Sequence, residues 1–228
     1  MSQVSRGGPE SFQKIFSVSR ETISKLEIYA QLLEQWQSAV QLIAPSTLSN
    51  LWIRHFADSA QLMFFSPPVV NTWIDLGSGG GFPGLIIALM AQDPSFQSEI
   101  KRIILIESDT RKAAFLREVA RQLGVVVDIL CGRIETLTTQ ATVGKGDVIS
   151  ARACAPLDVL LGYTFPYCKP KTMGLFLKGS EVQTEINKAN QLFMFKLELK
   201  PSVSDPTGQI VKIWDLEFKG EGKALCQA

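Results

Sequence analysis

The residues best suited to chemistry surround a short glycine-rich stretch of the chain. Asp75 is followed by Gly77, Gly79 and Gly81 in the pattern D-x-G-x-G-x-G. Apolar residues precede the stretch and fill residues 85–90 after it, which predicts a buried strand, a tight turn and the start of a helix. Glycines in such a turn let the backbone come close to a ligand and adopt positive φ angles. The stretch therefore predicts a binding site for a nucleotide-like ligand.

The residues beside the glycines indicate which ligand this is. In dinucleotide-binding proteins a G-x-G-x-x-G turn binds a pyrophosphate at the N-terminus of the next helix. Here an aspartate precedes the first glycine, and Gly81-Phe82-Pro83-Gly84 closes the helix entry that a pyrophosphate needs. S-adenosylmethionine has no phosphate and carries a charged amino acid tail. We therefore expect S-adenosylmethionine as the cofactor, with NAD as the alternative.

A second carboxylate, Glu107, ends another apolar run, residues 103–107. We expect this run to form the strand beside the glycine turn. A carboxylate at the carboxyl end of that strand can accept hydrogen bonds from both ribose hydroxyls of an adenosine. A helix cap or a solvent-exposed acid is the alternative interpretation of Glu107.

Three further charged residues, Glu135, Arg152 and Lys178, stand at or just after the ends of later predicted strands. The turn Gly132-Arg133-Ile134-Glu135 would lie beside an adenine, where a backbone N–H and an apolar side chain read and stack on the base. Ligands of parallel sheets bind at the carboxyl ends of the strands, so we expect these side chains to share one rim with the two carboxylates above. Surface charges at strand ends are the alternative for Arg152 and Lys178.

The elements that position these residues alternate between strand and helix, which predicts an α/β fold. We expect a doubly wound, mostly parallel, Rossmann-like sheet with helices on both faces. Apolar stripes at helical spacing predict two earlier helices, residues 19–43 and 47–65. Residues 1–68 would then form an N-terminal helical appendage, packed as one unit with a domain of residues 69–228. The predicted parallel strands are residues 73–76, 103–107, 125–130, 147–150 and 173–177, and an antiparallel pair follows at residues 191–199 and 209–218.

Composition excludes several classes of protein. No apolar run in the 228 residues approaches the roughly 18 residues that a membrane-spanning helix needs. The N-terminus carries no secretory signal, so we expect a cytoplasmic protein. The four cysteines form no C-x-x-C pair and there is one histidine, so we expect neither a metal site nor a disulfide framework. The net charge of +1 implies that any nucleic-acid binding rests on a local basic face. No long apolar stripe is left over, so we expect a monomer.

Several motifs together resemble one known family over nearly the whole chain. This is the glucose-inhibited division protein B (GidB) family, the bacterial small-subunit (16S) ribosomal RNA guanine-N7 methyltransferases. The glycine turn with its Phe-Pro-Gly ending is the most specific of the motifs. The matching residues are Arg54-His55, Asp58-Ser59, residues 75–84, Glu107-Ser108, Arg111-Lys112, Phe115-Leu116, Gly132-Arg133-Ile134-Glu135, Ser150-Ala151-Arg152-Ala153 and Lys178-Gly179.

The resemblance implies a cofactor, a partner and roles for particular residues. The cofactor is S-adenosylmethionine, and the partner is small-subunit ribosomal RNA or the small ribosomal subunit. Cofactor contacts are implied at Gly77, Phe82, Ile134, Glu135 and Arg152. Roles near the RNA or the methyl transfer are implied for Arg133, Arg152 and Lys178.

The chain also departs from the family pattern. The family usually carries W-N-x-x-x-N-L-T at the end of its first long helix, whereas this chain has glutamine at both asparagine positions, Gln37 and Gln41, and isoleucine for the threonine. The arginine that the family has before its last strand is absent, and Gln209 stands near that position. These departures leave two alternatives open: a methyltransferase with another RNA or small-molecule acceptor, and a ribosome-binding protein without catalytic activity.

Methylation of guanine N7 fits the residues available. N7 carries a free lone pair, so its attack on a sulfonium methyl group needs no general base, and the site would work by in-line positioning. An arginine or lysine can donate to guanine O6 and orient the base while N7 stays free. We expect Arg152 and Lys178 to position the guanine or its phosphate. His55, three residues before Asp58, is interpreted either as a buried polar group that locks the appendage onto the sheet or as an RNA-facing group.

Overall fold

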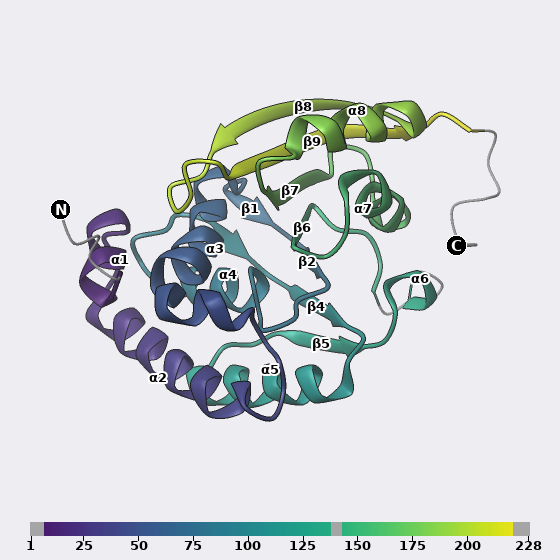
Figure 1. The fold of residues 1–228 in the computed structure, drawn as a ribbon. Helices are drawn as coiled ribbons and strands as arrows, with labels where there is room; N and C mark the ends of the chain where they lie inside the picture. The colour runs from purple at the N-terminus through teal and green to yellow at the C-terminus, as the bar shows by residue number, and fades with distance from the viewer. Residues whose placement is uncertain (1–6, 138–142, 221–228) are drawn as a thin grey trace.

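The computed structural model describes residues 7–137 and 143–220, and a seven-stranded sheet runs through its centre (Figure 1). The strand order is β5-β4-β2-β6-β7-β9-β8. The five strands from β5 to β7 are parallel, and β9 and β8 are antiparallel to their neighbours, which confirms the predicted mostly parallel sheet. The strands are β2 Trp73–Leu76, β4 Ile103–Glu107, β5 Asp128–Cys131, β6 Val148–Arg152, β7 Met173–Lys178, β8 Phe193–Pro201 and β9 Gln209–Phe218.

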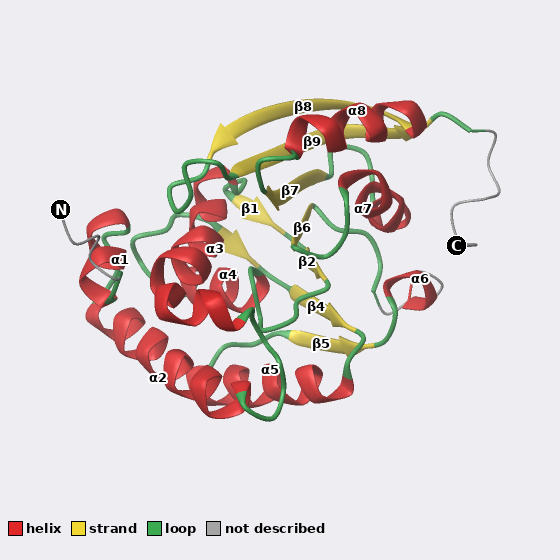
Figure 2. Ribbon diagram, in the orientation of Figure 1, coloured by secondary structure: helices red, strands yellow, loops and turns green. Residues whose placement is uncertain are grey.

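Helices cover both faces of the sheet (Figure 2). Alternate residues of a strand point to opposite faces, so Trp73 belongs to one hydrophobic core and its neighbour Ile74 to the other. The first core is completed by α2 Arg20–Gln37, α4 Gly84–Met90 and α5 Thr110–Leu123. The second is completed by α6 Ile134–Leu137, α7 Leu157–Thr164 and α8 Val182–Leu192. In the described residues, no helix is both long and apolar enough to cross a membrane.

The third strand begins later than the sequence predicts. We predicted residues 125–130, and β5 is Asp128–Cys131. Gly124 ends α5 in the left-handed conformation with φ 65°, and Val125 N–H then donates to Ala120 O, so this valine closes the helix. Val126 is 90% exposed and therefore cannot serve as a core position of a strand.

The first long helix is shorter than its apolar stripe. The stripe runs to Ile43, but α2 ends at Gln37, whose side chain holds the following loop. Gln37 Oε1 accepts from the backbone N–H groups of Leu42 and Ile43, and its Nε2 donates to Ile43 O at 2.7 Å. The loop therefore folds back against the helix end, which keeps Leu42 and Ile43 buried without continuing the helix.

The second predicted helix, residues 47–65, is not one α-helix. It consists of a 3₁₀ turn Pro45–Asn50, a π turn Trp52–Ala57, the short α3 Asp58–Ala60 and a 3₁₀ turn Gln61–Phe65. An apolar stripe does not distinguish these windings, because all of them return side chains to one face every three to five residues. The sequence leaves residues 1–16 as either a loose terminus or a short first helix, and the structure has the short helix α1 Pro9–Ile15. The two-stranded parallel pair β1 Val69–Val70 and β3 Glu99–Ile100, and helix α8, were not predicted.

The C-terminal hairpin reaches back to the N-terminal helical segment. The loop between β8 and β9 packs on the segment that contains α3, where Asp58 Oδ1 accepts from Ser202 Oγ at 3.0 Å and from Ser204 Oγ at 2.6 Å. Gln61 Oε1 accepts from Val203 N–H at 2.9 Å. The antiparallel C-terminal pair is thus confirmed, and its loop is fixed to the N-terminal helical segment.

Candidate active site

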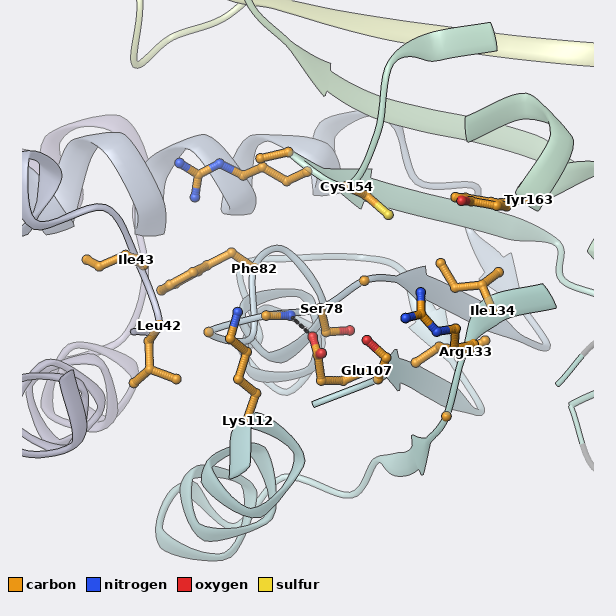
Figure 3. A pocket seen from close by; sticks show the side chains of 18 of the residues that line it. Leu42, Ile43, Ser78, Phe82, Glu107, Lys112, Arg133, Ile134, Cys154 and Tyr163 are labelled. Atoms are coloured by element: carbon orange, nitrogen blue, oxygen red, sulfur yellow. Dashed lines mark hydrogen bonds between the residues drawn. The ribbon is translucent and has the colours of Figure 1, made fainter. Parts of the chain in front are cut away.

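A cavity of about 400 Å³ opens at the carboxyl ends of the parallel strands. Figure 3 shows Leu42 and Ile43 at one end of this cavity, Tyr163 and Ile134 at the other, and Glu107 between them. Eight of its residues come from or flank the glycine turn and β4, at the carboxyl ends of the strands, where the sequence predicts the site. It is lined by Leu42, Ile43, His55, Gly77, Ser78, Gly79, Gly80, Phe82, Ile106, Glu107, Ser108, Lys112, Gly132, Arg133, Ile134, Glu135, Arg152, Ala153, Cys154 and Tyr163.

The glycine turn requires glycine for two different reasons. Gly77, Gly79 and Gly81 have φ values of 66°, 56° and 91°, a region that other residues rarely adopt. A Cβ at Gly77 would also lie 2.7 Å from Cys154 Sγ, and a Cβ at Gly81 would collide with Tyr29 Oη. Gly77 and Gly79 line the cavity, whereas Gly81 faces the packed side of the turn.

Asp75 acts on the turn from behind. Its side chain is completely buried; Oδ1 accepts from Ser150 Oγ at 2.8 Å and Oδ2 accepts from Gly84 N–H at 3.1 Å. Burial raises the pKa of Asp75 to about 6, although the hydrogen bonds from Ser78, Ser150 and Gly84 act in the opposite direction. Asp75 does not line the cavity, so the structure gives it the role of holding the start of α4 in position.

Glu107 faces the cavity and is 7% exposed. Its Oε2 accepts from Gly79 N–H at 2.7 Å, and its Oε1 accepts from Asp109 N–H at 2.8 Å. The helix cap of α5 is Asp109, which accepts from Arg111 N–H and Lys112 N–H, so Glu107 is not the cap. Each carboxylate oxygen keeps a second lone pair, and both are available to a ligand in the cavity.

The opposite wall comes from the turn after β5. Ile134 and Glu135 line the cavity beside Tyr163, with Arg133 next to them. Burial and the negative charge of Glu135, together with a hydrogen bond to it, raise the pKa of Tyr163. Burial also raises the pKa of Cys154 to about 11, so its thiol stays protonated at neutral pH. This wall offers an apolar surface with an acidic acceptor at its edge.

A second cavity of about 240 Å³ adjoins the first, and both are lined by Arg152 and Ala153. Arg152 Nε lies 3.3 Å from Asp58 Oδ2, and its guanidinium carbon lies 5.8 Å from the centre of the Phe82 ring. Burial lowers the pKa of Arg152, and the nearby Asp58 opposes that shift. The rest of the second cavity is lined mainly by charged and polar side chains, with one leucine and two glycines: Arg54, Asp58, Leu177, Lys178, Gly179, Ser202, Ser204, Asp205, Gly208 and Gln209.

Lys178 lines only this second cavity. Its Nζ lies 2.7 Å from Glu185 Oε2 on α8 and donates to Ala155 O at 2.6 Å. The side chain is only 8% exposed. The ammonium group therefore stands at the junction of β7 and the turn after β6, with an acidic partner already in place.

Tyr29 supports the glycine turn from behind the cavity, and the sequence gives no sign of this role. From α2, its hydroxyl donates to Gly80 O at 2.5 Å, and its ring stacks on Phe82 at 5.6 Å with an angle of 8°. It lies one turn from Leu26 and Leu33 on the buried face, so helical spacing indicates burial. The spacing gives no sign that the hydroxyl holds the glycine turn, because that contact spans 51 residues.

The structure brings most of the predicted site residues together and separates three of them. Gly77, Gly79, Phe82, Glu107, Arg133, Ile134, Glu135 and Arg152 line the first cavity. Asp75 and Gly81 lie behind the turn, and Lys178 lies in the second cavity. Leu42, Ile43, Lys112, Cys154 and Tyr163 are lining residues that were not predicted. Among residues 7–137 and 143–220, no three His, Cys, Asp or Glu side chains group as a metal site would require.

Solved structures share this fold at low sequence identity. An O-methyltransferase from Bacillus cereus, solved in complex with SAH, superposes with a TM-score of 0.59 and 10% identity, covering 91% of this chain and 96% of that one. A mutant MtNAS, solved in complex with S-adenosylmethionine, gives a TM-score of 0.52 and 15% identity over 92% of this chain and 85% of that one. The fold is therefore that of class I methyltransferases.

Sequence relatives are much more similar. A protein named ribosomal RNA small subunit methyltransferase G from Parvibaculum lavamentivorans is 46% identical over 91% of each chain. The protein of that name from Rhodospirillum centenum is 41% identical over 92% of this chain and 91% of its own. The model of the family described as GidB, rRNA small subunit methyltransferase G, matches residues 22–209. On this match and these identities, the chain belongs to the GidB family of rRNA small subunit methyltransferases G.

Proposed function

We propose that this protein transfers the methyl group of S-adenosylmethionine to N7 of a guanine in small-subunit ribosomal RNA. The observation that carries the proposal is the pair of adjoining cavities that share Arg152 and Ala153. A methyl donor and its acceptor have to meet in line, and two cavities with a common wall allow such a meeting. Membership of the family supplies the reaction class and the RNA substrate.

The first cavity fits the cofactor part by part. Glu107 has a free lone pair on each oxygen for the ribose hydroxyls, and Ile134 offers an apolar surface for the adenine. The backbone at Gly77 and Gly79 leaves room for the amino acid tail beside the turn. With the adenosine at Glu107 and Ile134, the methyl group would point toward Arg152. Asp75 and Gly81 support the cofactor indirectly, because they shape the turn from its far side.

The acceptor guanine would enter through the second cavity. Guanine N7 attacks the methyl carbon with its own lone pair, and the methyl–sulfur bond breaks as the thioether product forms. No proton has to be removed before this step. Arg152 donates to the guanine O6 or to a phosphate, and Lys178 adds a positive charge at the same cavity. Arg133, at the other end of the first cavity, is assigned to RNA contact.

The glutamines that depart from the family pattern do not favour another acceptor. Gln37 hydrogen-bonds within its own loop and lines neither cavity. Gln41 is exposed on the outer side of that loop, in a shallow depression with Asp109 and Arg111. Gln209 lines the second cavity, so of the departures it is the one with a position near the acceptor.

We propose that the protein acts as a monomer in the cytoplasm.

The test is the transfer of a labelled methyl group to small-subunit RNA or subunits from a strain that lacks this protein. We expect incorporation at one guanine N7, reduced about 100-fold or more in Arg152→Ala, since a charged hydrogen-bond donor at the reacting base is lost. Arg121→Ala is the matched control, because Arg121 is exposed on α5, where it pairs with Glu118, and it lines neither cavity. Cofactor binding without any incorporation into the RNA would contradict the proposed acceptor.

A further inference from the structure

His55, the single histidine of the chain, is 5% exposed and lies between Arg152 and the 3₁₀ turn Pro45–Asn50. Its Nδ1 is 2.7 Å from Arg152 Nη1, and its Nε2 is 2.8 Å from Thr47 Oγ1. Thr47 Oγ1 in turn donates to Ala44 O at 2.8 Å. A line of three hydrogen bonds therefore runs from this turn to the arginine that both cavities share.

The chemistry of the partners fixes the proton on the imidazole ring. A guanidinium group can only donate hydrogen bonds, so Nδ1 has to accept with its lone pair. A neutral imidazole then carries its proton on Nε2, which donates to Thr47 Oγ1. The threonine proton is already committed to Ala44 O, so its oxygen is the acceptor in this bond. Every donor in the line faces an acceptor only when His55 is the Nε2–H tautomer.

The surroundings keep this imidazole neutral. Burial, together with the positive charges of Arg152 and Arg54, lowers the pKa of His55 to about 3. A second proton would have to sit on Nδ1, where it would point at the guanidinium group and replace an attraction by a repulsion. The Arg152–His55 bond therefore persists across the pH range in which most histidines titrate.

Two of the three nitrogens of the Arg152 guanidinium group face hydrogen-bonding partners among the described residues, and the third, Nη2, does not. Nε lies toward Asp58 and Nη1 toward His55, while the ring of Phe82 lies against the guanidinium group. The described residues form no hydrogen bond with Nη2. We propose that His55 is a positioning residue: through its Nδ1 lone pair it fixes the guanidinium of Arg152, so that the Nη2 N–H groups are directed at the acceptor. This inference rests on the proposed role of Arg152.

The first experiment reads the tautomer directly. With one histidine in the chain, protein labelled with ¹⁵N-histidine gives a single imidazole in a long-range ¹H–¹⁵N correlation spectrum. We expect the proton on Nε2, unchanged between pH 5.5 and 8. In Thr47→Val, which removes the acceptor of that proton, we expect the proton to stay on Nε2, because Arg152 still donates to Nδ1. A proton on Nδ1 in the wild-type protein, or a normal titration in this range, would overturn the inference.

The second experiment uses two amides that differ by one methylene group. Asparagine places its carbonyl oxygen where His55 has Nδ1, whereas glutamine places its amide where His55 has Nε2. We expect His55→Asn to keep the bond to Arg152 and to lose less than about threefold in kcat. His55→Gln is expected to lose about tenfold or more, since it offers no acceptor at that point. The Kd for S-adenosylmethionine should stay within about twofold in both.

The outcomes separate this inference from the proposed function. Equal kcat values for the two amides, at similar melting temperatures, would show that the histidine only fills space. A wild-type protein that methylates no small-subunit RNA would remove the proposed acceptor but leave the tautomer experiment valid. In that case the Arg152→Ala protein decides for His55: we expect the Nε2–H preference to weaken, and an unchanged spectrum would refute the pairing.

Discussion

Replacing Asp75 by asparagine should change how the stability of the protein depends on pH. The carboxyl is completely buried and its pKa is raised to about 6, from an ordinary value near 4 in the unfolded chain. Between these two values the folded protein binds more protons than the unfolded chain at this residue. The free energy of unfolding therefore falls as the pH rises from 4 to 6, and it levels off above that range.

The size of the effect follows from the shift. Roughly two pKa units at about 1.4 kcal/mol each give about 3 kcal/mol of stability lost between pH 4 and 7 through Asp75. Asparagine keeps the shape and an acceptor for Gly84 N–H but carries no charge. The difference in unfolding free energy between wild type and Asp75→Asn should therefore change by about this amount over that range. Urea denaturation at several pH values measures it.

Asp93 provides a matched control of opposite sign. It is also buried, but hydrogen bonds from Ser95, Thr22 and Ser19 outweigh the effect of burial and lower its pKa. Its contribution to stability is thus present above its unfolded pKa and is lost as the pH falls. Asp93→Asn should cost most at neutral pH. The reasoning would be refuted if the difference in unfolding free energy between the wild type and Asp75→Asn stayed constant with pH. It would also be refuted if this difference grew with rising pH, as is expected for Asp93.

Three further predictions concern the glycine turn and its ligand. Tyr29→Phe removes a buried hydrogen bond to the turn and should cost about 1–3 kcal/mol of stability and about tenfold in cofactor affinity, measured by calorimetry. Thr172→Val, which removes a buried hydrogen bond just before β7, at the other ends of the parallel strands, should cost stability alone. Glu107→Gln should weaken S-adenosylmethionine binding about 10- to 100-fold and also lower the melting temperature, because the amide nitrogen cannot accept from Gly79 N–H or Asp109 N–H; unchanged binding would place the ribose elsewhere. Gly81→Ala should destabilise more than Gly124→Ala, because both have positive φ but only Gly81 has a side chain in the way; equal melting temperatures would contradict this.

The sequence predicts the site well where strand order alone decides it. Glu107 and Arg152 end apolar runs that form the two parallel strands on either side of β2, so their meeting at the carboxyl ends of the strands follows from the fold class. The glycine pattern likewise predicts a close backbone approach. It cannot tell on which side of the turn Asp75 lies, because a residue at a strand end can face the cavity or the core behind it.

The remaining features depend on contacts between distant segments. The Arg152–His55 bond joins residues 97 positions apart, and the hydrogen bond of Tyr29 to the turn spans 51. Periodicity reports only that such residues are buried. The uneven winding of residues 45–65 was missed for a related reason: a mixed 3₁₀, π and α segment keeps the same apolar face as a regular helix.

The docking of the last hairpin loop onto Asp58 has a consequence for the order in which the protein is made. Every residue that lines the first cavity precedes position 164, whereas the second cavity needs residues up to 209. During translation the chain leaves the ribosome from its N-terminus, so all residues that line the first cavity emerge before the loop that completes the second. The second cavity is therefore the last part of the site to form, and a chain released early would lack it.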